Sequence, residues 1–153
     1  MLAHPWFAII VIAHVLVGVI GFGALAMTGA YARLASHAPQ PTSVPSLVRF
    51  FQPGRNLAAR TILLVPIFGA IALAYSHDTH KLYPYLGLGI WFIATGIASA
   101  LVWPSERTLQ AMFSDPTANL AELARVARRC DRAAMATSCC FVGALVVMIA
   151  QPA

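Results

Sequence analysis

The sequence predicts an all-α fold, a bundle of four transmembrane helices. Of its 153 residues, 59% are hydrophobic and 10% are charged, whereas about a quarter of the residues in a soluble domain are charged. Four apolar runs can be drawn without overlap, at about residues 5–32, 57–76, 84–103 and 133–150, and a helix needs about 20 residues to cross the hydrocarbon layer. These runs leave no room for a separate soluble domain, so we treat residues 1–153 as a single integral membrane domain.

Basic residues are distributed unevenly between the two ends of this predicted bundle. Nine of the ten Lys and Arg residues lie in or beside the first and third loops, and Lys81 alone lies in the second loop. Loops rich in Lys and Arg stay on the cytoplasmic side of a membrane. The asymmetry therefore predicts a multi-pass protein with both termini and the turn at 77–83 on the opposite, outer side. It also accounts for the net charge of +5 without a nucleic-acid partner.

The first run begins at Pro5 and Trp6, which suit the first turn of a helix and the headgroup level of a membrane. No Lys or Arg precedes this run, and it is about twice as long as the apolar part of a signal peptide. We therefore expect it to be retained as a span. His14 is the one histidine, acid or base within it. The helical rise places His14 about 14 Å from the outer end, near the middle of the membrane.

Helical spacing places Gly18 and Gly21 one and two turns along from His14 on the same face. The imidazole therefore borders a groove with almost no side chains, which can receive another helix or a flat cofactor. Because ionisable residues inside a membrane usually mark a functional site, these three are the candidate cofactor-binding residues. We favour the alternative that a neutral His14 donates a hydrogen bond to a neighbouring helix, since no carboxylate pair, activated nucleophile or phosphate-binding loop lies within the runs.

The first loop, at 37–56, is interrupted by Pro39, Pro41, Pro45 and Pro53. A short apolar patch surrounds Arg49 and consists of Leu47, Val48, Phe50 and Phe51. We expect this segment to lie on the inner leaflet with Arg49 and Arg55 near lipid phosphates, which makes both arginines candidate membrane-surface residues. A docking surface for a partner subunit is the alternative.

The second and third runs carry signals of helix packing. Asn56 suits the N-cap of the second run, and Pro66 predicts a kink that frees a backbone carbonyl for a neighbour or a ligand. The turn at 77–83 contains two histidines, but matching third and fourth ligands are missing nearby, so we predict no metal site. In the third run, Gly96 and Ser99 belong to a stripe of small residues that lets membrane helices approach closely.

The third loop follows Trp103 and Pro104 and contains the start of the last helix. Asp115 and Pro116 suit an N-cap and the position after it, and apolar residues recur at helical spacing from there to the fourth run. We therefore expect a cytoplasmic helical extension that continues into the last span. Its basic residues are candidate membrane-surface residues: Arg125, Arg128 and Arg129.

Several features together form a familiar pattern: His14 followed by glycines, Trp103-Pro104 with Glu106 and Arg107, an Ala- and Arg-rich segment, and the ending Val147-Met148-Ile149-Ala150-Gln151-Pro152. Over nearly its whole length the chain resembles an uncharacterised bacterial family of predicted four-span integral membrane proteins. The helix around His14 is also similar to the first helix of the membrane haem-pathway protoporphyrinogen oxidases and of the copper-resistance D-type proteins. The resemblance to these bacterial families implies a location in the bacterial inner membrane, with the termini in the periplasm. The resemblance to the oxidases implies that His14 ligates haem b; the iron would then need a second ligand, from water, Met27 or a partner chain.

From these observations we expect a non-catalytic accessory or structural subunit of a larger membrane complex. Its partners would be lipids and other integral membrane proteins or further copies of itself, and this interpretation assigns no catalytic residue, metal or cofactor. The alternative is a haem b-binding membrane redox protein or haem-pathway oxidase with His14 as axial ligand. A transporter is a third hypothesis, which would require four short spans to oligomerise into a pathway.

Overall fold

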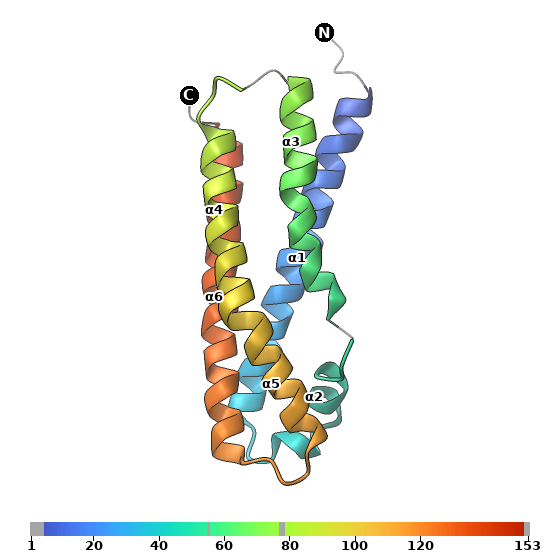
Figure 1. Cartoon of the computed structure of the whole chain (residues 1–153), viewed down its shortest axis with the longest axis vertical. Helices are drawn as coiled ribbons and strands as arrows, with labels where there is room; N and C mark the ends of the chain where they lie inside the picture. The colour runs from blue at the N-terminus through green and yellow to red at the C-terminus, as the bar shows by residue number, and fades with distance from the viewer. Residues whose placement is uncertain (1–4, 55, 77–78, 152–153) are drawn as a thin grey trace.

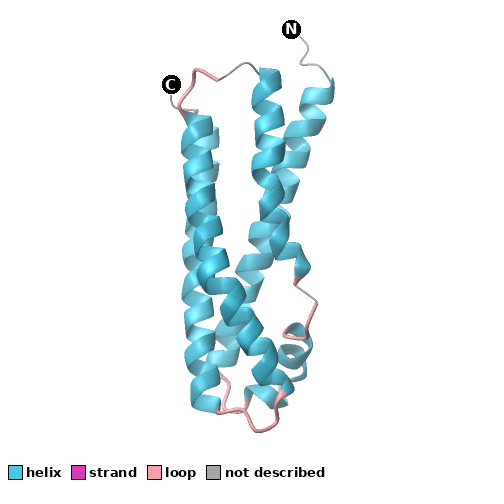
Figure 2. Ribbon diagram, viewed as in Figure 1, coloured by secondary structure: helices cyan, strands magenta, loops and turns pink. Residues whose placement is uncertain are grey.

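The computed structural model describes residues 5–54, 56–76 and 79–151 (Figure 1). All regular structure in these ranges is helical (Figure 2). Four helical stretches are long and apolar enough to cross a membrane: Pro5–His37, Leu57–Ser76, Tyr83–Ser114 and Leu120–Ala150. The prediction of an all-α protein is therefore confirmed, and four helices have the length and composition of membrane spans. Arg55 and the turn residues His77 and Asp78 lie outside the described residues.

The bundle consists of two helix pairs. α1 (Pro5–His37) packs most extensively on α6 (Leu120–Ala150), while α3 (Val65–Ser76) lies along α1 and α4 (Tyr83–Ile97) lies along α6. Figure 1 shows the start of α1, the end of α6 and the connection from α3 to α4 at one end, which we call the terminal end. We call the opposite end, with the loops before and after α2 and before α6, the basic end.

The buried core lies in the basic half of the bundle. Its largest fully buried apolar side chains come from α1, the first loop, the start of the second span, η3, α5 and α6: Leu25, Leu47, Phe51, Ile62, Val102, Leu109 and Leu123. In the terminal half, α3 has no buried residue, and the ribbons of α3 and α4 lie apart (Figure 1). Bulky apolar side chains such as Ile9, Ile71 and Val146 are exposed there. In a membrane these side chains face lipid or another protein.

The first loop closes the basic end of the bundle. It contains the short helices η1 (Pro41–Ser43) and α2 (Pro45–Phe50). The ring of Phe50 stacks on Tyr31 with centroids 3.9 Å apart, and Phe51 stacks on Phe113 with centroids 5.0 Å apart. The apolar patch that we expected on the inner leaflet therefore packs inward, because burying these rings against α1 and α5 removes more apolar area from water than a surface position would. Arg49 remains exposed.

The second span changes helix type instead of kinking within one α-helix. Its first part is the 3₁₀-helix η2 (Leu57–Leu64), and α3 begins at Val65, directly before Pro66. A proline in the first turn of α3 has no intrahelical N–H to lose. Asn56 is the N-cap residue of the second span, as predicted, but its side chain makes no capping hydrogen bond; its amide has another partner, described below.

The third span continues past the predicted exit at Trp103. A π-turn, η3 (Ala98–Val102), joins α4 to α5 (Trp103–Ser114). The backbone N–H of Trp103 donates a hydrogen bond to the carbonyl of Ala98. Pro104 thus lies in the first turn of α5, where it does not interrupt the chain of hydrogen bonds. The helix extends about three turns into the region that we expected to be a loop.

The last span is one unbroken helix, as the sequence predicts, but it starts later than Pro116. Asn119 is the N-cap of α6, and its side chain accepts hydrogen bonds from Ala121 N and Glu122 N. Asp115 instead accepts from the hydroxyl and backbone N–H of Thr117, at 2.7 and 2.8 Å. These hydrogen bonds lower the pKa of the Asp115 carboxyl, because they favour its charged form.

Candidate functional site

His14 lies at the contact between α1 and α3. Its Nδ1 is 2.9 Å from the backbone oxygen of Val65, the first residue of α3. The imidazole also packs against Gly69, where an added Cβ would lie 3.1 Å from His14 Cε1. Gly69 therefore leaves the space that the imidazole occupies. The hydrogen bond to a neighbouring helix that we favoured for His14 is present.

This hydrogen bond fixes the roles of the two ring nitrogens. A carbonyl can only accept, so Nδ1 carries a proton, and in the neutral ring Nε2 is left with a lone pair. Among the described residues, Nε2 has no hydrogen-bond partner. Histidines that ligate metals commonly have this arrangement, with one ring N–H donated to a carbonyl and the other nitrogen free.

A second aromatic nitrogen binds the same junction between η2 and α3. Pro66 has no N–H, so it cannot donate to the carbonyl of Ile62, four residues earlier. Trp91 of α4 donates its Nε1–H to that oxygen at 2.8 Å. The same oxygen also accepts the backbone N–H of Val65. The carbonyl that Pro66 was predicted to free is thus bound both within the second span and by a neighbouring helix, and Trp91 links α4 to the second span at this point.

The predicted groove beside His14 is occupied by the chain itself. An added Cβ on Gly21 would lie 2.6 Å from the backbone nitrogen of Ile62, so η2 packs directly on α1 there. At Gly18 the neighbours are side chains of Val65 and Phe141, at 4.0 and 3.9 Å from an added Cβ. Of the two expected occupants, the structure places a helix in the groove.

The predicted packing stripe on the third span faces outward. Gly96 and Ser99 are both exposed, and an added Cβ on Gly96 would meet nothing within 4 Å. Ser99 donates its hydroxyl to Thr95 O within its own helix, at 2.8 Å. Helix packing within the described chain therefore does not use these two residues. Ala94 and Ala98 are the small residues that α4 and η3 bury instead.

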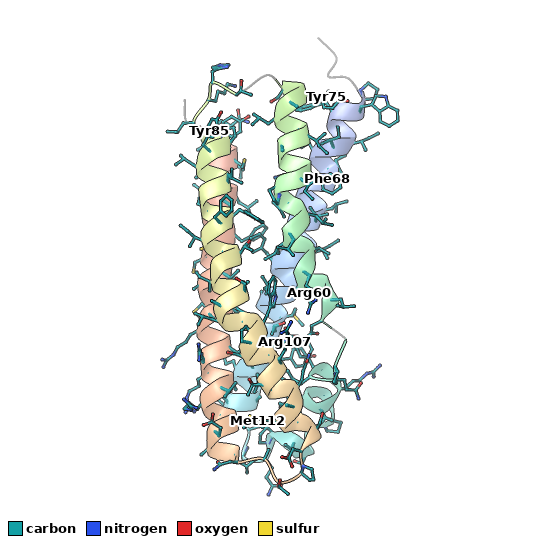
Figure 3. The ribbon with its side chains drawn as sticks, viewed as in Figure 1. Arg60, Phe68, Tyr75, Tyr85, Arg107 and Met112 are labelled. Carbon is teal, nitrogen blue, oxygen red and sulfur yellow. The ribbon has the colours of Figure 1, made fainter. Side chains whose placement is uncertain are left out.

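A second polar site lies in the basic half and was not predicted. Glu106 of α5 is 7% exposed, and its Oε1 accepts hydrogen bonds from Asn56 Nδ2 at 2.5 Å and Gln110 Nε2 at 3.5 Å. The positive charges of Arg60 and Arg107, both labelled in Figure 3, also act on this carboxylate. The amide that we assigned to a helix cap thus joins the second span to the third.

Helical spacing could have revealed Glu106. Val102 and Leu109 are buried on the same face, four residues before it and three residues after it. A helix that ends at Pro104 would not place Glu106 on this buried face, so the expected helix end concealed the site.

The candidate membrane-surface arginines that the structure describes are all exposed: Arg49, Arg125, Arg128 and Arg129. Arg125 donates its Nε–H to Glu122 Oε2 at 2.8 Å, one turn earlier in α6. These positions allow contact with lipid headgroups at the basic end, and the membrane-surface role stays a prediction. Arg55 lies outside the described residues.

The described residues contain no group of three or more His, Cys, Asp or Glu side chains that could hold a metal ion. The buried hydroxyls of Thr28 and Thr137 donate to carbonyls of their own helices, while Thr95 Oγ1 and Trp103 Nε1 are buried without a hydrogen-bond partner among the described residues. No family model, curated protein or solved structure matches the chain.

Proposed function

We propose that the protein is a non-catalytic accessory subunit of a larger complex in a bacterial inner membrane. The observation that supports this proposal is that three of its interior polar side chains make hydrogen bonds between different parts of the bundle. His14 binds Val65, Trp91 binds Ile62 and Asn56 binds Glu106, and each of these bonds joins one part of the bundle to another. Such bonds hold helices in register, and a set of reactive groups around one point would be needed for catalysis.

The terminal half of the bundle supports a role in assembly. α3 has no buried residue and contacts mainly α1 and the preceding η2. Its outer face carries Ile67, Ile71 and Tyr75, all more than a third exposed. A helix held along one side only has a long face for another integral membrane protein.

Site-specific photo-cross-linking in native membranes tests this proposal. A photoreactive phenylalanine analogue at Ile67 or Ile71 should give a discrete heavier adduct that contains a second polypeptide. The matched control is the same analogue at Ile149, an exposed residue near the end of α6. If the α3 positions give no protein adduct while the protein remains folded, the accessory role is wrong.

Haem b ligation is the second candidate, and the free Nε2 of His14 favours it. This nitrogen fits an axial ligand, and haem would supply redox chemistry. The surroundings fit less well, because Val65 and Phe141 fill the space beside Gly18. Met27 lies about 20 Å further along α1 by the helical rise, so it cannot ligate the same iron.

Visible absorbance of the purified protein separates the two candidates. The accessory role predicts no Soret band, and it predicts that His14→Gln, which keeps a donor and an acceptor, lowers stability less than His14→Leu. Haem ligation predicts a Soret band in the wild type that His14→Ala abolishes.

A further inference from the structure

A groove runs between α1 and α6 in the basic half of the bundle. Its volume is about 700 Å³, and it is open along one side. It is lined by Ala26, Gly29, Ala30, Arg33, Leu34, His37, Asp131, Ala134, Met135 and Ser138. Small residues line most of its floor. At Gly29 the helices are so close that an added Cβ would lie 2.6 Å from Ala134 Cβ. The two backbones approach so closely that no bulky side chain fits between them.

The two charged residues of the groove come one from each helix, Arg33 from α1 and Asp131 from α6. An added Cβ on Gly29 would be 3.7 Å from the carbonyl oxygen of Asp131, and Arg33 follows Gly29 by one helical turn toward the basic end. Among the described residues, no ion pair joins Arg33 to Asp131. The Nδ1 of His37 is bound to the carbonyl of Arg33 at 2.8 Å. One fixed positive charge and one fixed negative charge therefore border the same groove.

We propose that this groove binds a phospholipid with an ethanolamine headgroup. Arg33 binds the phosphate, since a guanidinium suits phosphate oxygens, and Asp131 accepts hydrogen bonds from the primary ammonium. An acyl chain lies over Ala26, Ala30 and Met135, along the apolar part of the groove. Basic pockets between membrane helices on the cytoplasmic side are a recurring kind of lipid site.

Charge complementarity selects this headgroup over the two most similar ones. An anionic glycerol headgroup offers a phosphate to Arg33 but brings no cation to Asp131. A choline headgroup carries a cation, but its quaternary nitrogen has no N–H to donate. The glycerol hydroxyls can donate hydrogen bonds to Asp131, but they carry no charge. Of these three headgroups, only ethanolamine offers Asp131 a cation that also donates N–H hydrogen bonds.

Native mass spectrometry of the delipidated full-length protein tests the assignment. The protein is mixed with equal amounts of phosphatidylethanolamine, phosphatidylglycerol and phosphatidylcholine of the same acyl chains. We expect retention of the ethanolamine lipid over each of the others by up to about fivefold, the effect of one partly exposed charge pair. Equal retention of the three lipids would overturn the proposal.

Single substitutions test whether the preference for the ethanolamine lipid arises from the groove. Asp131→Asn keeps the shape of the side chain and should abolish the preference for ethanolamine over glycerol, while Arg33→Gln should weaken retention of both lipids. Arg125→Gln, on the exposed surface of α6, is the control for general attraction between arginines and lipids and should leave the ethanolamine preference unchanged. An unaltered preference in Asp131→Asn, or a dimer that forms in place of the lipid adduct, contradicts the proposal.

Discussion

Glu106 shows how one side chain can hold two segments together. Its carboxylate is buried where the start of the second span meets α5, with Asn56 of the former and Gln110 of α5 as hydrogen-bond donors. A buried donor that loses its acceptor is destabilising, because it is removed from water without compensation. The stability of the basic half therefore depends on this acceptor.

We predict that Glu106→Ala lowers the free energy of unfolding by about 1–3 kcal/mol, since Asn56 loses its partner and remains partly buried. Glu106→Gln should have a smaller effect, because its amide oxygen still accepts a hydrogen bond. Thermal unfolding in detergent measures both changes. Glu122→Ala, at an exposed position of α6 paired with Arg125, is the control and should leave the midpoint nearly unchanged. A shift in the control as large as that of Glu106→Ala would contradict this prediction.

For His14, the sequence predicts the kind of interaction but not the partner. A histidine in an apolar helix predicts a hydrogen bond to a neighbour, and this bond is present. Its acceptor, Val65 O, could not be predicted, because the path of the first loop decides which turn of the second span lies opposite. The same loop brings Asn56 to Glu106, 50 residues later in the sequence. Local sequence patterns cannot predict a contact between residues so far apart along the chain.

At the scale of the elements, hydropathy predicts that the four spans are helical, but it does not predict where each helix begins and ends. Pro66 and Pro104 were expected to kink or end helices, but each lies in the first turn of a new helical segment, after a 3₁₀-helix and a π-turn respectively. Each proline lacks the N–H that would bond one turn back, and at Pro66 the carbonyl of Ile62 is instead bound by Val65 N–H and by Trp91. Whether a proline interrupts a helix or begins one depends on the backbone before it, which composition does not reveal.

The two glycines Gly21 and Gly96 make a matched test of helix packing. Gly21→Leu should destabilise the protein by at least about 1–3 kcal/mol, because the new side chain would push η2 away from α1. Gly96→Leu should leave the unfolding midpoint of the isolated protein unchanged, since open space surrounds that position. Thermal unfolding in detergent compares the two variants. An equal loss in both would show that Gly96 packs against a helix.

At the scale of the whole molecule, the charge asymmetry makes a prediction about orientation. The basic end should be cytoplasmic and the terminal end periplasmic, because nine of the ten Lys and Arg residues belong to the first and third loops and their flanks. An alkaline phosphatase reporter, active only in the periplasm, should be inactive when inserted at Ala118 and active when fused after Ala153. A green fluorescent reporter at the same sites should give the reverse pattern. Phosphatase activity at Ala118 would overturn the orientation.

The pairing of α1 with α6 has a consequence for biogenesis. Along this sequence α1 is synthesised well before α6, and the two helices share the most extensive contact in the bundle. Until α6 is synthesised, Phe22 and Gly29 of α1 lack the residues that they contact, Phe141 and Ala134. The hydroxyl of the neighbouring Thr28 is bonded to Ala24 O of its own helix, so its hydrogen bond does not depend on α6. A chain that stops before residue 120 therefore lacks the most extensive helix contact of the bundle.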